Sequence, residues 1–202
     1  MTSRREAQRD ALITTAETII SQKGLGALRA RDLATEVGCA VGAIYTYVED
    51  LDELVLRVGV RTLSRLGEAL QATTAETLDA SPREQLTAIA LTYADFAAGN
   101  VNLWRALFEF RLSAHQQLPE WSAGAQTSLF TYLDAPLKTL LPDLSDEDRQ
   151  LLARTLFSAV HGVVALGLED RHVAVPRAAL HAQIRMLVAA LAVGLPEVRQ
   201  GG

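Results

Sequence analysis

The sequence predicts an all-α protein of about nine helices, and three observations support that fold class. Apolar residues recur three and four positions apart along almost the whole chain, and no stretch of strict apolar–polar alternation competes with this pattern. Gly, Pro and small polar residues separate the periodic segments, as they do at helix ends. Apolar residues make up 49% of the 202 residues, which is enough to build a core and excludes a mainly disordered chain.

The first 75 residues are expected to form three short helices and one long helix. The apolar stripe of the first helix consists of Leu12, Ile13, Ala16, Ile19 and Ile20. A left-handed Gly24 is expected to end this helix, and Gly38 to end a second helix over about 29–37. A third helix is expected over about 40–48, and Asp50 then caps a fourth over about 51–75. The buried face of the fourth helix is expected to consist of Leu54, Val58, Leu63, Leu66 and Leu70.

Five more helices are expected in the remainder of the chain. Their expected ranges are 82–98, 101–115, 119–142, 146–167 and 176–195, with a kink at Pro136. Ser81 and Ser145 are the expected N-caps, because their hydroxyls can accept a hydrogen bond from a free backbone N–H of the first turn. The Gly194-Leu195-Pro196 sequence is expected to end the last helix.

The composition excludes several classes of protein. A single cysteine, Cys39, forms neither an intramolecular disulfide nor a Cys-rich zinc site. The first ten residues are charged where a secretory signal would turn apolar. The longest late charge-free stretch, residues 155–168, is too short to cross a membrane. We therefore expect a soluble, cytoplasmic protein without membrane association.

Charge is distributed unevenly along the chain. The first 31 residues carry a net charge of +3, whereas the whole chain carries −5, so the remainder is acidic. A cationic leading end on an acidic body suggests a local contact with a polyanion. A chance fluctuation on a solvated helix face gives the same pattern, and charge alone does not separate the two interpretations.

Two short periodic segments between residues 28 and 48 are separated by Gly38-Cys39-Ala40. A helix-turn-helix needs this arrangement, because a tight turn holds the second helix at a steep angle so that it can enter the major groove of DNA. The spacing alone is a moderate signal, since any two short helices produce it.

The residues of this segment resemble the DNA-binding motif of the TetR family of transcriptional repressors. The matching positions are Arg31-Asp32-Leu33-Ala34, Gly38, Gly42, Ile44-Tyr45, Tyr47-Val48 and Leu54. The resemblance covers about residues 6–66, with the motif at about 30–49, and Val160-His161-Gly162 is similar to the Trp-His-Gly signature of one TetR regulatory-domain subgroup. It implies an N-terminal helix-turn-helix domain over 1–50 and a C-terminal helical bundle for ligand binding and dimerisation over 51–202.

The resemblance also implies roles for individual residues. The first turn of the third helix would lie nearest the bases, where glycine allows close approach and Val or Ala methyl groups contact apolar features such as the thymine methyl. The expected DNA-binding residues are Arg31, Val41, Gly42, Ala43, Tyr45, Thr46 and Tyr47. In the alternative interpretation Tyr45 belongs to the core of a three-helix bundle, and Ile44 is expected there in either case.

Two positions depart from the family pattern. Ala40 replaces the usual capping Ser of the third helix, a loss of about 1 kcal/mol. Leu51 replaces a Lys that contacts a phosphate in relatives, and Glu49 and Asp50 place negative charge close by. We therefore expect DNA binding that is weaker and less dependent on salt than is usual for this fold.

All five Phe and both Trp lie between residues 80 and 170, which suggests an aromatic-lined cavity for a small-molecule effector. The expected effector-binding residues are Trp104, Phe108, Trp121, Phe130, Phe157 and His161. Aromatic residues at helical spacing are more often ordinary core, and that alternative stays open for each of them. His161 could equally be a buried, hydrogen-bonded residue without an effector contact.

No metal site and no cofactor are expected. No second ligand stands three or four residues from His161, and His115, His172 and His181 lack ligand spacing as well. Cys39 is expected to pack in the turn, with redox sensing as the alternative.

The last two expected helices are rich in Ala, Val and Leu on several faces, and we expect no other part of this sequence to cover them. Pairing with their copies across a twofold axis would bury them and form a homodimer. A palindromic double-stranded DNA operator requires that symmetry.

The favoured hypothesis is therefore a dimeric repressor that binds a palindromic operator and is released by a small-molecule effector. The alternative is a DNA-independent ligand-binding or protein-interaction module on the same fold. A helical enzyme is not supported, because the sequence contains no phosphate-binding Gly loop, HExxH motif or nucleophile elbow.

Overall fold

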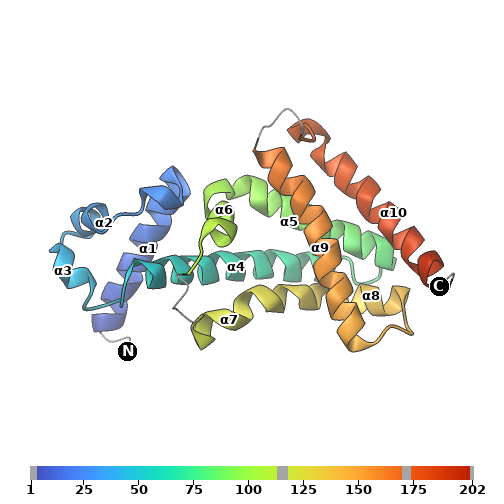
Figure 1. Ribbon diagram of the computed structural model, residues 1–202, viewed down its shortest axis with the longest axis horizontal. Helices are drawn as coiled ribbons and strands as arrows, with labels where there is room; N and C mark the ends of the chain where they lie inside the picture. Colours follow the sequence, from blue (N-terminus) through green and yellow to red (C-terminus); the bar gives the residue numbers. More distant parts are fainter. Residues whose placement is uncertain (1–3, 113–117, 170–173, 201–202) are drawn as a thin grey trace. The chain divides into compact units, whose positions relative to one another are not determined.

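The computed structural model describes residues 4–112, 118–169 and 174–200, and it consists of α-helices and short 3-10 helices (Figure 1). The predicted all-α fold class is confirmed, with ten α-helices among the described residues. The chain divides into two compact units, which we call unit 1 (residues 1–65 and 100–125) and unit 2 (residues 66–99 and 126–202).

Unit 1 contains the helices of the predicted DNA-binding segment. Its elements are α1 (Arg4–Lys23), η1 (Leu25–Ala27), α2 (Ala30–Val37), α3 (Val41–Ile44), the beginning of α4 (Leu51–Glu76), α6 (Val101–Glu109) and the beginning of α7 (Glu120–Thr127). The five predicted stripe residues of α1 are all buried and share one core with Leu33, Ile44 and Leu54. The amphipathic pattern thus places α2, α3 and α4 against the same face of α1.

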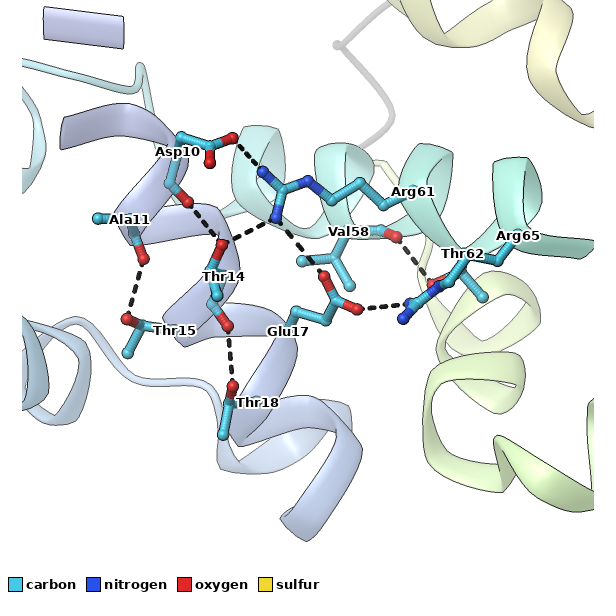
Figure 2. A network of polar contacts seen from close by, with 10 residues as sticks. All are labelled: Asp10, Ala11, Thr14, Thr15, Glu17, Thr18, Val58, Arg61, Thr62 and Arg65. Atoms are coloured by element: carbon cyan, nitrogen blue, oxygen red, sulfur yellow. Dashed lines mark hydrogen bonds and ion pairs between the residues drawn. The ribbon is translucent and has the colours of Figure 1, made fainter. Parts of the chain in front are cut away.

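A polar network along one side of unit 1 also joins α1 to α4 (Figure 2). Arg61 donates to Asp10 and, at 3.0 Å, to the hydroxyl of Thr14, and Arg65 lies 2.5 Å from a carboxylate oxygen of Glu17. These charged side chains range from 17% to 69% exposed, so water screens each pair and each contributes little free energy, although together they align the two helices.

Glycine ends both of the first two helices, but in different conformations. Gly38 is left-handed, with φ 73° and ψ 38°, as the sequence predicts. Gly24 has φ 81° and ψ 169°, so the expectation of a left-handed helical cap at this position was wrong. The chain extends directly into η1 at Gly24 instead of curling back, and this backbone region is open almost only to glycine.

The third helix is shorter than predicted. α3 covers only Val41–Ile44, and residues 45–47 form a hydrogen-bonded turn rather than helix. The amides of Thr46 and Tyr47 donate to carbonyl oxygens three residues back, at 3.2 and 2.9 Å, which is the tighter 3-10 pattern. No side chain caps the start at Ala40, and Gly42 weakens the helix further, so the α-helical pattern does not propagate.

Unit 2 consists of helices that pack around α5 (Pro82–Gly99). Its other elements are the end of α4, η2 (Ser128–Leu133), α8 (Asp134–Leu140), α9 (Asp146–Leu168), η3 (Arg177–Ala179) and α10 (Leu180–Gln200). α10 lies alongside α5, and α8 and α9 also contact it (Figure 1). Leu137, Val164 and Ile184 are the most completely buried large apolar residues that α8, α9 and α10 contribute.

The predicted helix caps of unit 2 are confirmed. Ser81 and Glu84 form a reciprocal capping box, in which the Ser81 N–H donates to the Glu84 carboxylate at 2.9 Å. The hydrogen bond from the Ser81 hydroxyl is the main cause of the lowered pKa of Glu84. The Ser145 hydroxyl accepts from the amide of Asp148 at 3.1 Å at the start of α9.

Three predicted helix boundaries were wrong. The break before α8 is η2, and Pro136 lies in the first turn of α8, where its missing N–H has no partner to lose. α10 starts after η3 and continues through the Gly194-Leu195-Pro196 sequence to Gln200 instead of ending there. α6 ends at Glu109, well before the predicted residue 115, which lies outside the described residues.

Two helices of unit 2 are apolar on more than one side. Asp146–Leu168 and Arg177–Leu195 are each long and apolar enough to cross a membrane by length and composition, although core helices of soluble proteins meet the same criterion. The charge-free stretch 155–168 is only part of the first of these helices. Only 22% of the most apolar stretch of each helix is buried within the subunit. A large part of this apolar surface is therefore available for contact with another molecule.

Candidate nucleic-acid interface and effector site

The turn between α2 and α3 is fixed by backbone hydrogen bonds. The Gly38 amide donates to the carbonyl of Thr35 at 3.2 Å, and the Cys39 amide donates to that of Ala34 at 2.9 Å. These two bonds define a Schellman motif, which requires the left-handed glycine observed at Gly38. Cys39 packs against the unit 1 core, as expected for a structural residue.

The segment from Val41 to Tyr47, which we call the 41–47 segment, has two distinct sides. Ile44 is completely buried, and Tyr47 packs partly against the same core. On the other side Val41 and Tyr45 are 39% and 48% exposed, and Gly42 and Thr46 are exposed with them. The alternative in which Tyr45 is a core residue therefore does not hold, because its ring is open to solvent.

The remaining predicted DNA-binding residues are also accessible. Ala43 is half-buried, and Arg31 is exposed on α2. Of the seven predicted residues, none is fully buried, and six belong to the 41–47 segment. Their role in DNA binding stays a prediction, but a partner can reach every one of them.

The two departures from the family pattern have visible local consequences. No side chain caps α3 at Ala40, whose ψ of 145° leaves the backbone extended. Leu51 packs partly against the unit 1 core instead of extending toward solvent. Next to it, Asp50 caps α4 by accepting from the Glu53 amide at 2.8 Å. Burial, and secondarily the charge of Asp50, raises the pKa of Asp52, so acidic groups crowd the start of α4.

A cavity of about 480 Å³ in unit 1 is lined in part by residues 45–47 of the 41–47 segment. Its lining includes Arg5 and Arg9 from α1, the Tyr45–Asp50 stretch, Arg57 from α4, and Trp121. Arg57 stacks over the Trp121 ring at 4.5 Å from its centroid and pairs with Glu53 at 2.7 Å. Sequence reasoning identified Arg5 and Arg9 only as part of a cationic leading end, without a partner.

The predicted effector residues fall into two groups. Phe130, Phe157 and His161 lie together in unit 2. The ring centroid of Phe157 is 5.5 Å from that of Phe130 and 5.4 Å from that of His161. Tyr93, which the sequence analysis did not select, joins them, because its hydroxyl lies 2.7 Å from Nδ1 of His161. Its ring meets that of Phe157 edge-on, with centroids 5.3 Å apart.

The other three predicted effector residues belong to unit 1. Trp104 is almost fully buried and packs against Phe108 with ring centroids 5.3 Å apart. Trp121 is 44% exposed and is the residue stacked under Arg57. We base the effector hypothesis on the group in unit 2, because it contains the Tyr93–His161 pair.

His161 is half-buried among aromatic rings, and burial lowers its pKa below the ordinary value of 6.5. The neutral imidazole is therefore favoured, and it exchanges a hydrogen bond with Tyr93 in a direction set by its tautomer. The described residues contain no group of side chains that could hold a metal ion. His181 pairs with Asp95 at 2.6 Å, and His115 and His172 lie outside the described residues.

The lowered pKa of His161 predicts a pH dependence of stability. The unfolded chain binds a proton at His161 more readily than the folded chain does. The contribution of the neutral imidazole to stability is therefore complete above about pH 6.5, and it is lost as the pH falls toward the pKa of His161 in the folded protein. We expect the urea midpoint to fall more steeply in the wild type than in His161→Gln on acidification from about pH 7.5 to about pH 5. Parallel midpoint-against-pH curves for the two proteins would contradict this assignment.

Comparisons with known proteins agree with the fold. A family model described as "Tetracyclin repressor-like, C-terminal domain" matches residues 81–191, which is more than half of the chain. No curated protein sequence matches the chain significantly.

Solved structures of similar fold span nearly the whole chain. A TetR transcriptional regulator from Rhodococcus sp. RHA1 has a TM-score of 0.61 and 17% identity, covering 96% of this chain and 100% of that one. BioQ from Mycobacterium smegmatis has a TM-score of 0.63 and 21% identity, covering 93% and 97%. A structure of BioQ with its natural double-stranded DNA operator has a TM-score of 0.62 and 20% identity, covering 92% and 98%. Together with the family model, these matches identify a family of regulators rather than enzymes, and the chain belongs to the TetR family of transcriptional regulators.

Proposed function

We propose that the protein is a cytoplasmic repressor that binds a palindromic DNA operator as a homodimer and is released by a small-molecule effector. The observation that carries this proposal is the two-sided 41–47 segment. Ile44 anchors it to the core while Val41, Gly42 and Tyr45 remain exposed beside a tight Schellman turn. A short element held this way can present side chains to base edges in the major groove. The complex of the similar protein BioQ with its operator supports DNA as the partner.

The apolar surface of α9 and α10 supports the homodimer. α10 buries one stripe, Leu180, Ile184, Val188 and Ala192, inside the subunit. Its exposed residues include four further apolar ones spaced about one turn apart, Ala182, Met186, Ala190 and Val193. On α9, Leu151 and Leu166 are 61% and 44% exposed. A twofold pairing of these two helices with their copies would bury this surface and place two 41–47 segments in symmetric positions.

The aromatic residues around His161 support an effector site in unit 2. Phe130, Phe157 and Tyr93 provide apolar ring surface, and the Tyr93–His161 pair provides polar atoms that can orient a ligand. α4 contributes residues to both units, so a change in its tilt could alter the separation of the two DNA-binding segments. The effector must bind one dimer conformation better than the other, since equal affinity for both shifts no equilibrium.

Selection from a random duplex library with the full-length protein tests the proposal. We expect recovery of palindromes whose half-sites are separated by about 10 base pairs or a multiple of that distance. Repeating the selection with a small-molecule fraction of cell extract should reduce recovery, if the fraction contains the effector. Duplexes no more enriched than bulk DNA would overturn the DNA-binding part of the proposal.

The salt dependence of binding gives a separate prediction. Because Leu51 packs against the core and acidic groups surround it, we expect few phosphate contacts per subunit and a shallow slope of log affinity against log salt. Leu51→Lys should strengthen binding and steepen the slope by about 0.9 for each new phosphate contact. A steep wild-type slope, or an unchanged slope in Leu51→Lys, would contradict this account.

The second candidate function is a ligand-binding or protein-interaction module that does not bind DNA. The uncapped start of α3 and the crowded acidic groups at the start of α4 favour it. The two functions differ in the outcome of the library selection. A module of this kind would still dimerise and still bind its ligand, but no duplex would be enriched.

A further inference from the structure

The 41–47 segment has little helical structure of its own. α3 comprises four residues, and a helix this short is not stable in isolation. After Ile44 the chain continues as a turn, in which the Thr46 hydroxyl donates to the carbonyl of Ala43 at 2.7 Å. The orientation of Tyr45 and Tyr47 therefore depends on contacts from outside the segment.

Apolar packing provides some of these contacts. Ile44, Tyr47 and Val48 pack against the unit 1 core. Residues 45–48 also line the cavity of about 480 Å³, and so does Arg5. A polar group of the cavity wall can therefore support the peptide group between Thr46 and Tyr47.

Arg5 supplies this support. Its guanidinium Nη2 donates to the carbonyl oxygen of Thr46 at 3.1 Å, joining the first turn of α1 to a residue 41 positions later. The Tyr47 amide, which belongs to the same peptide group, donates to the carbonyl of Ile44 at 2.9 Å. The carbonyl and the amide of one peptide plane are thus both held, and a cation placed at the C-terminal end of a helical turn also complements its dipole.

We propose that Arg5 is a positioning residue for DNA recognition, which fixes the Thr46–Tyr47 peptide and so orients Tyr45 and Tyr47, and that it does not bind a phosphate. This inference rests on the proposed DNA-binding function. The competing role is a direct phosphate contact from the cationic leading end of the chain, and the two roles differ in their salt dependence. A phosphate contact contributes about 0.9 to the slope of log affinity against log salt, whereas a positioning residue contributes nothing to it.

The first experiment compares Arg5→Gln with the matched control Arg4→Gln, which removes an equal charge from the neighbouring exposed residue. Affinity is measured across a salt series for a duplex recovered by the library selection and for a scrambled duplex. We expect Arg5→Gln to weaken specific binding about threefold per half-site, the effect of a modest hydrogen bond, and so about tenfold for a palindrome. The slope and the scrambled-duplex affinity should match those of Arg4→Gln, and Arg5→Lys should recover part of the loss. A slope that falls by about one unit more in Arg5→Gln than in the control would overturn the proposal.

The second experiment needs no DNA. Hydrogen exchange of the Tyr47 amide is measured by NMR in the DNA-free full-length protein. Arg5→Gln should accelerate this exchange about threefold to tenfold, because the peptide group loses one of its two anchors, while Arg4→Gln leaves it unchanged. Equal exchange rates in the two variants would overturn the positioning role. If no duplex is ever selected, the proposed function fails, and the Tyr47 amide still decides whether Arg5 holds this peptide.

Discussion

The double variant Leu166→Asp/Met186→Asp is expected to be a monomer instead of a dimer. Both side chains are exposed on α9 and α10, at 44% and 60%, so the subunit itself should fold normally. In the dimer they would become buried, and an uncompensated buried charge costs about 3–5 kcal/mol. We expect light scattering to report a monomer at micromolar concentration and operator affinity to fall by about 100-fold or more.

A matched control separates this effect from a general loss of solubility or stability. Leu78 is 72% exposed and lies outside α9 and α10, so Leu78→Asp should remain dimeric and bind the operator normally. The dimer assignment is contradicted if the double variant stays dimeric, or if the wild type is itself monomeric at these concentrations.

Ile44→Ala should lower the free energy of unfolding by about 2–5 kcal/mol, as expected when a large buried side chain is truncated. Ile44 is completely buried and is the residue through which α3 joins the core formed by α1, α2 and α4. Urea unfolding measures the loss, and Ile44→Val should lose only about 0.5–1.5 kcal/mol.

Val41→Ala is the matched control on the same helical turn. Val41 is 39% exposed, so its truncation should change the free energy of unfolding by no more than about 0.5 kcal/mol. Its effect should appear in operator affinity instead, because the removed methyl groups face the proposed DNA. If Val41→Ala binds the operator as the wild type does, the exposed side of the 41–47 segment does not read the bases at this position.

Local sequence signals predicted the secondary structure wherever the signal and its partner lie close together. The capping residues Asp50, Ser81 and Ser145 all cap helices as expected, because their partners lie three residues away. The buried faces of α1 and α4 also follow from the spacing of their apolar residues alone. Periodicity and capping are properties of a single helical turn, so one sequence is enough to read them.

The wrong predictions concern elements whose length depends on several weak effects. The stretch 40–48 has a helical apolar pattern, but the missing cap at Ala40 and the glycine at Gly42 together shorten α3 to one turn. Pro136 was expected to kink a long helix, whereas the chain changes to a 3-10 helix before it. In both cases helix was predicted in the right part of the chain but with the wrong boundaries.

The candidate sites could be predicted only in part, because their contacts join distant positions. Tyr93 and His161 are separated by 68 residues, and Arg5 and Thr46 by 41. No spacing rule links such pairs, which is why Tyr93 and Arg5 were absent from the predicted sites. Aromatic content grouped Trp104 with Phe157, although they belong to different compact units. The exposed residues of the 41–47 segment were found because the family motif specifies them.

The central claim is that two copies of the exposed 41–47 surface read two symmetric half-sites, and half-site dependence tests it most directly. The affinity of the full-length protein is measured at one salt concentration for the selected duplex, for a duplex with one half-site scrambled, and for one with both scrambled. We predict a loss at each step, ending at the salt-dependent non-specific affinity, which is about 10³-fold or more below that of the intact site. Equal affinity for all three duplexes would contradict the claim.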